Sequence, residues 1–179
     1  MGSHILIAGV GYTYLHDWSV GPKVAAQLKE GRDFPTGVDI DDWSFGPLDA
    51  VYRLREEQPP YDKVVFFGAI DRGHPIGTVT RHVWDKAELP GPDQIQQAIG
   101  EAISGVISLD NLVYVCAAFD ALPECVMLEV EPDPEQKFSD EYSPQMTAAI
   151  PVLLRYIEEE AGLGEEESSR PSASQEKRQ

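Results

Sequence analysis

The chain has 179 residues, of which 42% are hydrophobic, and its formal net charge at pH 7 is -17. A chain of this length is ordinary for one domain with a single hydrophobic core. Nucleic acids and anionic membranes bind clusters of Lys and Arg, so the negative charge argues against both as partners. The first ten residues lack the basic segment and cleavage site of a signal peptide, and we therefore expect a cytoplasmic protein.

Strand and helix patterns alternate along the chain. Strand patterns are apolar or alternating runs, and they occur at residues 5–10, 36–43, 64–67, 78–84 and 126–130. Helix patterns repeat apolar residues at spacings of three and four, and they occur at residues 20–31, 48–55, 95–107, 109–122 and 144–157. Ser108 and Ser143 stand where residues that cap the starts of helices are expected.

This alternation predicts a three-layer α/β/α domain around a mainly parallel, five-stranded sheet. We expect the domain to cover residues 1–163. Residues 164–179 hold an acidic run and almost no apolar side chain, so we expect a disordered acidic and polar tail. Ligands of such sheets bind beyond the carboxyl ends of the strands. The loops at residues 11–19 and 68–77 are therefore the candidate site.

Several short motifs follow one another in a fixed order. They are Gly9-Val10-Gly11 with Asp17 and Val20-Gly21, Arg72-Gly73-His74-Pro75-Ile76-Gly77-Thr78, Leu122-Pro123-Glu124, Glu131-Pro132 and Ser143-Pro144. Over about residues 4–158 the set resembles the hydrogenase maturation proteases. These endopeptidases remove a carboxyl-terminal extension from the large subunit of nickel-iron hydrogenase after nickel insertion. The resemblance implies a phosphorylase/hydrolase-like fold and a hydrogenase large subunit, or a related protein, as the partner.

The resemblance also implies three metal-contacting residues: an acidic residue in the first loop, an aspartate at the end of the third strand and a histidine before a late helix. The first position reads Asp17-Trp18, and Gly68 occupies the second, with Asp71 three residues further on. No histidine follows the fourth strand pattern, and Asp110 is the nearest replacement. Because Trp18 and Gly68 offer no ligating side-chain atom, we expect no metal at the family positions.

We favour a noncatalytic binding or assembly factor that has no cofactor of its own. Losing the imidazole and both carboxylates removes most of the affinity for a divalent metal, whereas the residues that pack the fold are kept. The aromatic first loop then offers a partner surface, because aromatic side chains are enriched at interface centres. The candidate cleft residues are Tyr12, His16, Asp17, Trp18, Gly68, Asp71, His74 and Asp110.

The alternative is an active endopeptidase that recognises nickel in its substrate large subunit and uses a rearranged site. Asp17, Asp71 and His74 are its fallback metal ligands, with Asp110 beside them. Each of these aspartates also has a structural explanation, because Asp is common at helix starts and in turns. Dinucleotide binding would rest on Gly9-Val10-Gly11 alone, without the third glycine of the usual motif.

Overall fold

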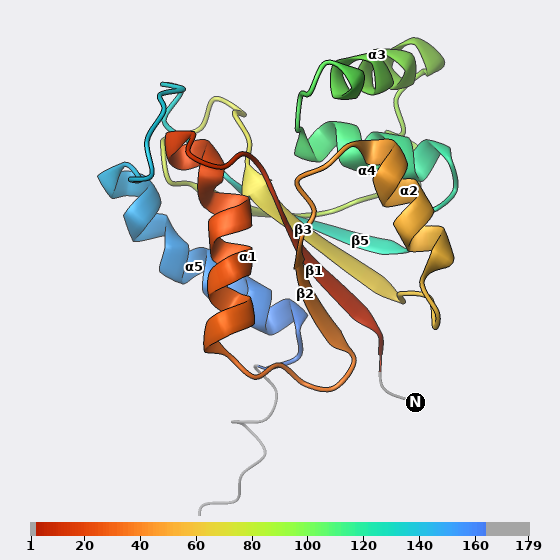
Figure 1. The fold of residues 1–179 in the computed structure, drawn as a ribbon, viewed down its shortest axis with the longest axis horizontal. Helices are drawn as coiled ribbons and strands as arrows, with labels where there is room; N and C mark the ends of the chain where they lie inside the picture. The colour runs from red at the N-terminus through yellow and green to blue at the C-terminus, as the bar shows by residue number, and fades with distance from the viewer. Residues whose placement is uncertain (1–2, 164–179) are drawn as a thin grey trace, which may run out of the picture.

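A five-stranded sheet forms the centre of the computed structural model, which describes residues 3–163. The strands are β1 (Ile5–Val10), β2 (Val38–Asp42), β3 (Lys63–Ala69), β4 (Val79–Val83) and β5 (Glu124–Val130). Their order is β2-β1-β3-β5-β4, and only β4 is antiparallel to its neighbour (Figure 1). The mainly parallel five-stranded sheet is confirmed, and the expected tail at residues 164–179 lies outside the described residues.

Helices cover both faces of the sheet, as expected for three layers. One face carries α1 (Val20–Gly31) and α5 (Pro144–Glu160). The other carries α2 (Pro47–Glu56) and α4 (Leu109–Ala118), and α3 (Pro92–Ile103) packs on the outside of α4 (Figure 1). Two short 3-10 helices, His16–Ser19 and Lys86–Glu88, lie in the connections. Within residues 3–163, no helix is long and apolar enough to cross a membrane.

The central strand β3 carries apolar side chains on both of its faces, and each face packs into one of the two cores. Val65 and Phe67 belong to the core beneath α1 and α5, whereas Val64 and Phe66 belong to the core beneath α2 and α4. All four side chains have 0% exposure. Side chains alternate between the two faces of a strand, so an uninterrupted apolar run fills both cores at once.

Helix boundaries follow the caps more closely than the apolar pattern. The expected caps are confirmed: the hydroxyl of Ser108 accepts a hydrogen bond from the Asn111 N–H, and that of Ser143 accepts one from the Met146 N–H. The helix expected at residues 95–107 ends at Ile103, because Gly105 has a φ of 84° and turns the chain away. The helix expected at residues 109–122 likewise ends early, at Ala118.

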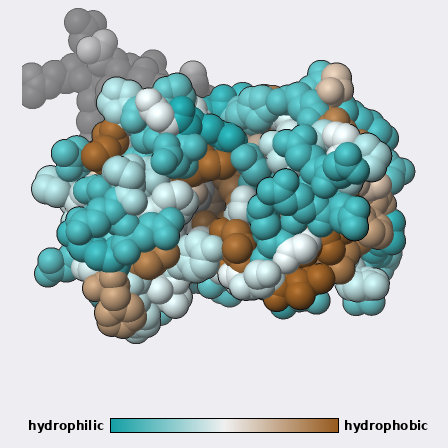
Figure 2. Space-filling view, turned by 90° about the horizontal axis from the view of Figure 1, so that it is seen from above, coloured by the Kyte–Doolittle hydropathy of each residue, from teal (hydrophilic) through white to brown (hydrophobic). Residues whose placement is uncertain are grey.

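The parallel strands bring three loops to one edge of the sheet. β1, β3 and β5 all end there, so residues 11–19, 70–78 and 131–143 leave the sheet side by side. A backbone bridge between Leu15 and Ser139 ties the first of these loops to the third. Figure 2, seen from above Figure 1, looks onto this end and shows a hollow between two lobes with hydrophobic residues along parts of it. The topology therefore places the two loops expected to form a site at one end.

At the opposite end of the molecule, Glu160 ties the last helix to the sheet. It is 8% exposed and accepts hydrogen bonds from Arg81 of β4 and Lys63 of β3. Burial by itself raises the pKa of this carboxyl group. The hydrogen bonds from Arg81 and Lys63 outweigh burial and hold the pKa of Glu160 below its ordinary value.

A depressed folded-state pKa stabilises the fold above the unfolded-state pKa, about 4.3 for Glu, and this stability is lost as pH falls through the folded-state value. We expect Glu160→Gln to lower the free energy of unfolding by about 2 kcal/mol at pH 7, with a smaller difference from wild type near pH 3. Urea titrations at both pH values measure this. The control Glu159→Gln removes an exposed pair with Arg155 and should cost less than about 0.5 kcal/mol. If wild type and Glu160→Gln differed by the same free energy of unfolding at both pH values, a depressed pKa of Glu160 would be contradicted.

Candidate functional site

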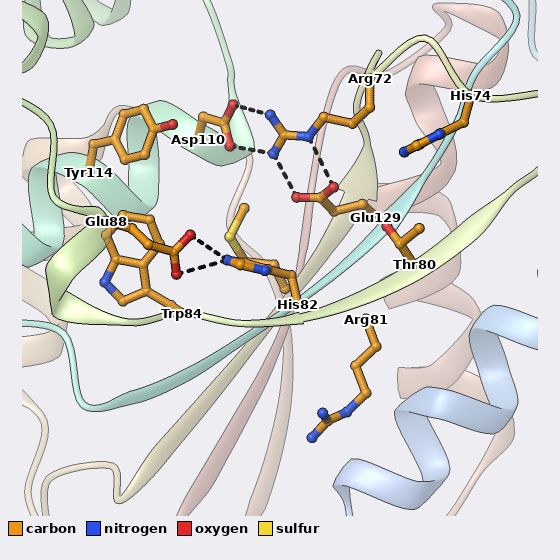
Figure 3. Close-up of a pocket in the computed structure, with 11 residues that line it drawn as sticks. Arg72, His74, Thr80, Arg81, His82, Trp84, Glu88, Asp110, Tyr114 and Glu129 are labelled. Atoms are coloured by element: carbon orange, nitrogen blue, oxygen red, sulfur yellow. Dashed lines mark hydrogen bonds and ion pairs between the residues drawn. The ribbon is translucent and has the colours of Figure 1, made fainter.

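Arg72, in the loop between β3 and β4, holds two carboxylates at the carboxyl edge of the sheet (Figure 3). Its Nε and Nη2 donate to the two oxygens of Glu129 at 3.0 and 2.7 Å. Its Nη1 and Nη2 also donate to the two oxygens of Asp110 at 2.9 and 2.8 Å. Both pairs are therefore bidentate, which is the geometry that planar guanidinium offers to carboxylates. The hydrogen bonds that Arg72 donates to Glu129, followed by those it donates to Asp110, raise the pKa of Arg72.

A third carboxylate holds the backbone of the same loop. Glu131, which directly follows β5, is 5% exposed. Its side chain accepts hydrogen bonds from the Arg72 N–H at 3.0 Å and from the Gly73 N–H at 3.0 Å. Since Glu129 is also buried, at 7% exposure, the strand end carries two carboxylates that would be costly without these donors. The loop conformation and the charge pairing therefore depend on each other.

Asp110 is the residue nearest in sequence to the place at which the resemblance expects a histidine. It lies in the first turn of α4, where the helix dipole favours negative charge. Both of its oxygens are hydrogen-bonded to Arg72. A metal at this point would have to displace a guanidinium that satisfies Asp110 and Glu129 together.

Gly68, at the position where the resemblance expects aspartate, has no room for a side chain. It pairs with Val10 across β1 and β3. A Cβ at residue 68 would lie 2.3 Å from the carbonyl oxygen of Val10, far inside van der Waals contact. The strands approach closely here, so glycine is required by packing, and an aspartate could enter only if the backbone moved.

Trp18 and Tyr12 belong to the first loop, residues 11–19, at the same end of the sheet. Trp18 is half-buried, and its indole Nε1 is buried with no hydrogen-bond partner among the described residues. The hydroxyl of Tyr12 accepts a hydrogen bond from the Ile107 N–H at 2.7 Å, which links the first loop to the start of α4. Neither side chain carries a group suited to a divalent metal.

Asp17 and His16 are interior residues of the first loop. The carboxylate of Asp17 has 0% exposure and accepts hydrogen bonds from the Ser143 N–H and hydroxyl, both at 2.7 Å, and from the Asp133 N–H at 2.9 Å. Nδ1 of His16 lies 2.7 Å from the carbonyl oxygen of Glu141, and the residue is 5% exposed. Both side chains are buried and fasten the first loop to the segment before α5, so neither is exposed as a surface for a protein partner.

Asp71 and His74 are exposed on the loop after β3. The carboxylate of Asp71 accepts a hydrogen bond from the Gly73 N–H at 3.0 Å, a common turn arrangement. The structure does not bring these two residues together with Asp17: among residues 3–163, no three His, Cys, Asp or Glu are placed to hold a metal. The side chains at the three family positions therefore do not fit nickel, because one is an indole, one is absent and the third is bound to Arg72.

Sequence reasoning placed Asp110 in the candidate site but missed its partners, Arg72 and Glu129. One signal was available: Glu129 is a charged residue inside an otherwise apolar run that forms a buried strand. A buried carboxylate requires a cation or several donors nearby. Arg72 follows β3, which is the neighbour of β5 in the sheet, so it lies close enough to be the cation that pairs with Glu129.

The close approach at Gly68 can be tested by adding one methyl group. We expect Gly68→Ala to lower the free energy of unfolding by about 2 to 3 kcal/mol, because the backbone must shift to relieve the contact with Val10. Denaturant titration measures the loss. Gly100→Ala is the matched control: nothing lies within 4 Å of a Cβ there, and alanine in the helix should add up to about 1 kcal/mol. If Gly68→Ala left the free energy of unfolding unchanged, the steric explanation for this glycine would be wrong.

Comparison with family models finds no match for this chain, and none is found among curated proteins. Solved structures do match. The hydrogenase 2 maturation peptidase from a Thaumarchaeota archaeon has 25% sequence identity and a TM-score of 0.63, and the match covers 90% of this chain and 99% of that one. The hydrogenase maturating endopeptidase HybD from E. coli has 17% identity and a TM-score of 0.66, with coverage of 90% and 94%.

A third match is the NiFe hydrogenase maturation protease HycI from Thermococcus kodakarensis, with 21% identity, a TM-score of 0.57 and coverage of 89% and 93%. These matches span nearly the whole of each solved chain. The chain therefore has the fold of the hydrogenase maturation peptidases and resembles them at low sequence identity.

Proposed function

We propose that this protein acts in the maturation of a nickel-iron hydrogenase large subunit as a noncatalytic binding or assembly factor in the cytoplasm. The proposal rests on one observation: a guanidinium takes up the carboxylate at the position where the family resemblance expects a metal-binding imidazole. Both oxygens of Asp110 accept hydrogen bonds from this guanidinium, so a divalent cation could bind Asp110 only by displacing it.

The fold around this point supports retained binding. Asp17 still holds the first loop against α5, and the Leu15–Ser139 bridge holds the first loop against the last. Hydrogen bonds between protein groups therefore hold together the end of the molecule that would meet a large subunit. Packing and coordination depend on different residues, so one can persist after the other has changed.

An exposed aromatic pair supplies a contact surface at the same end. Tyr14 is 54% exposed, Phe138 is 88% exposed, and their rings stack with centroids 5.8 Å apart. Tyr14 also has a φ of 59°, an uncommon backbone conformation for a non-glycine residue. Backbone strain of this kind costs stability and clusters at functional sites. Large exposed aromatic groups are typical anchors of protein interfaces.

The proposal is tested with a nickel-loaded large subunit that still carries its carboxyl-terminal extension. We expect a stable complex by size-exclusion chromatography and an uncut extension by mass spectrometry. Phe138→Ser should weaken the complex about tenfold, equal to the loss of about 1.4 kcal/mol at one anchor. The matched control is Ile103→Ser, which removes a side chain of similar exposure, 82%, from α3 and should change the affinity less than twofold.

Two outcomes would overturn the proposal. Removal of the extension, abolished by Asp71→Ala, would establish the rearranged endopeptidase instead. A large subunit that neither binds nor is cut would show that the partner has changed altogether.

A further inference from the structure

A cavity of about 400 Å³ opens between β4 and α4, beside the Arg72 ion pairs (Figure 3). Met127 of β5 lies beneath it and is 1% exposed. Trp84 and Tyr114 form an aromatic wall, with ring centroids 5.7 Å apart and planes at 48°. Both rings are half-buried, so part of each remains open to the cavity. The electron-rich faces of such rings attract cations.

The charges around this cavity are predominantly negative. Glu88, Asp110 and Glu129 contribute three carboxylates; the guanidinium of Arg72 pairs with Asp110 and Glu129, and Glu88 pairs with His82. Arg81 also lines the cavity, but its guanidinium points away in Figure 3 and binds a buried carboxylate of α5. Two histidines complete the polar lining, His74 and His82. Three carboxylates against the one guanidinium of Arg72 give this lining a net negative formal charge with the histidines neutral, and a cationic group entering here would meet that charge and two aromatic faces.

The neighbouring strand β4 is an edge strand. At its two ends, the Glu131 N–H donates to the Thr78 carbonyl and the Trp84 N–H donates to the Cys125 carbonyl. In an antiparallel pair, alternate residues bond to the partner strand, so the backbone groups of Val79, Arg81 and Val83 face outward. No other strand of the described residues pairs with this side of β4. An open edge of this kind can accept an extended segment of a partner.

We propose that an extended segment of a protein partner pairs with the open edge of β4 and places a lysine or arginine side chain in this cavity. The net charge of -17 favours a basic partner, and the aromatic wall with its carboxylates selects a cationic side chain. Backbone pairing supplies affinity, and the cavity supplies specificity. The inference rests on the proposed function only for the identity of the partner.

The test uses the full-length ¹⁵N-labelled protein and three capped pentapeptides, identical except for lysine, arginine or norleucine at the centre of a Thr-Val-X-Val-Thr sequence. We expect the lysine and arginine peptides to shift the indole N–H resonance of Trp84 and the amide resonances of Arg81 and Val83. The norleucine peptide, which keeps the apolar stem without the charge, should bind at least about tenfold more weakly. Binding of the charged peptides should also weaken as salt is added.

Tyr114 provides a matched pair of variants. Tyr114→Phe keeps the aromatic face and should retain binding within about twofold, whereas Tyr114→Leu removes it and should weaken binding about fivefold, in line with one lost cation–π contact. If all three peptides bind alike, if the shifts lie away from β4, or if no peptide causes a shift at millimolar concentration, the inference is wrong.

The peptide and large-subunit experiments fail independently. Peptide binding with no large-subunit complex would overturn the proposed function and leave this inference standing. A large-subunit complex that Tyr114→Leu does not weaken, together with no peptide binding, would overturn this inference alone.

Discussion

The guanidinium of Arg72 joins two parts of the chain that would otherwise repel each other. Glu129 ends a buried strand and Asp110 begins a helix, and each makes two hydrogen bonds to the same side chain. Removal of Arg72 would leave the buried Glu129 carboxylate and the partly exposed Asp110 carboxylate without their counter-charge. The loop after β3 keeps its path because Glu131 holds its backbone at the same place. The charge pairing at this end of the molecule therefore depends on one arginine.

The surrounding scaffold is maintained by contacts that have no part in metal coordination. The Asp17 carboxylate is occupied by donors from Ser143 and Asp133, which orient the last helix. Gly68 lets β1 and β3 approach so closely that a side chain has no space. These two residues stand at or beside positions where the family resemblance expects ligands, and both have structural roles here. This separation explains how a fold with TM-scores of 0.63 and 0.66 to maturation peptidases can carry a different set of charges at its site.

The sequence predicted much of the fold because apolar runs and caps have local causes. The apolar run around Phe66 predicted a central strand, and Ser108 and Ser143 mark helix starts because their hydroxyls accept hydrogen bonds from N–H groups three residues later. The boundary at Ile103 was missed because the apolar spacing continues through a glycine turn. The site was harder to predict: the burial of His16 and the pairing of Arg72 with Glu129 depend on loops that meet only after the sheet has formed. The spacing of residues along the sequence does not reveal contacts between loops that are far apart in the chain.

Anomalous diffraction from crystals soaked in a nickel salt would show whether Arg72 excludes a metal from these carboxylates. We expect Arg72 to keep its bidentate pairs with Asp110 and Glu129 and no nickel peak to lie within bonding distance of either carboxylate. A nickel ion bound to these oxygens, with the guanidinium displaced, would contradict this expectation.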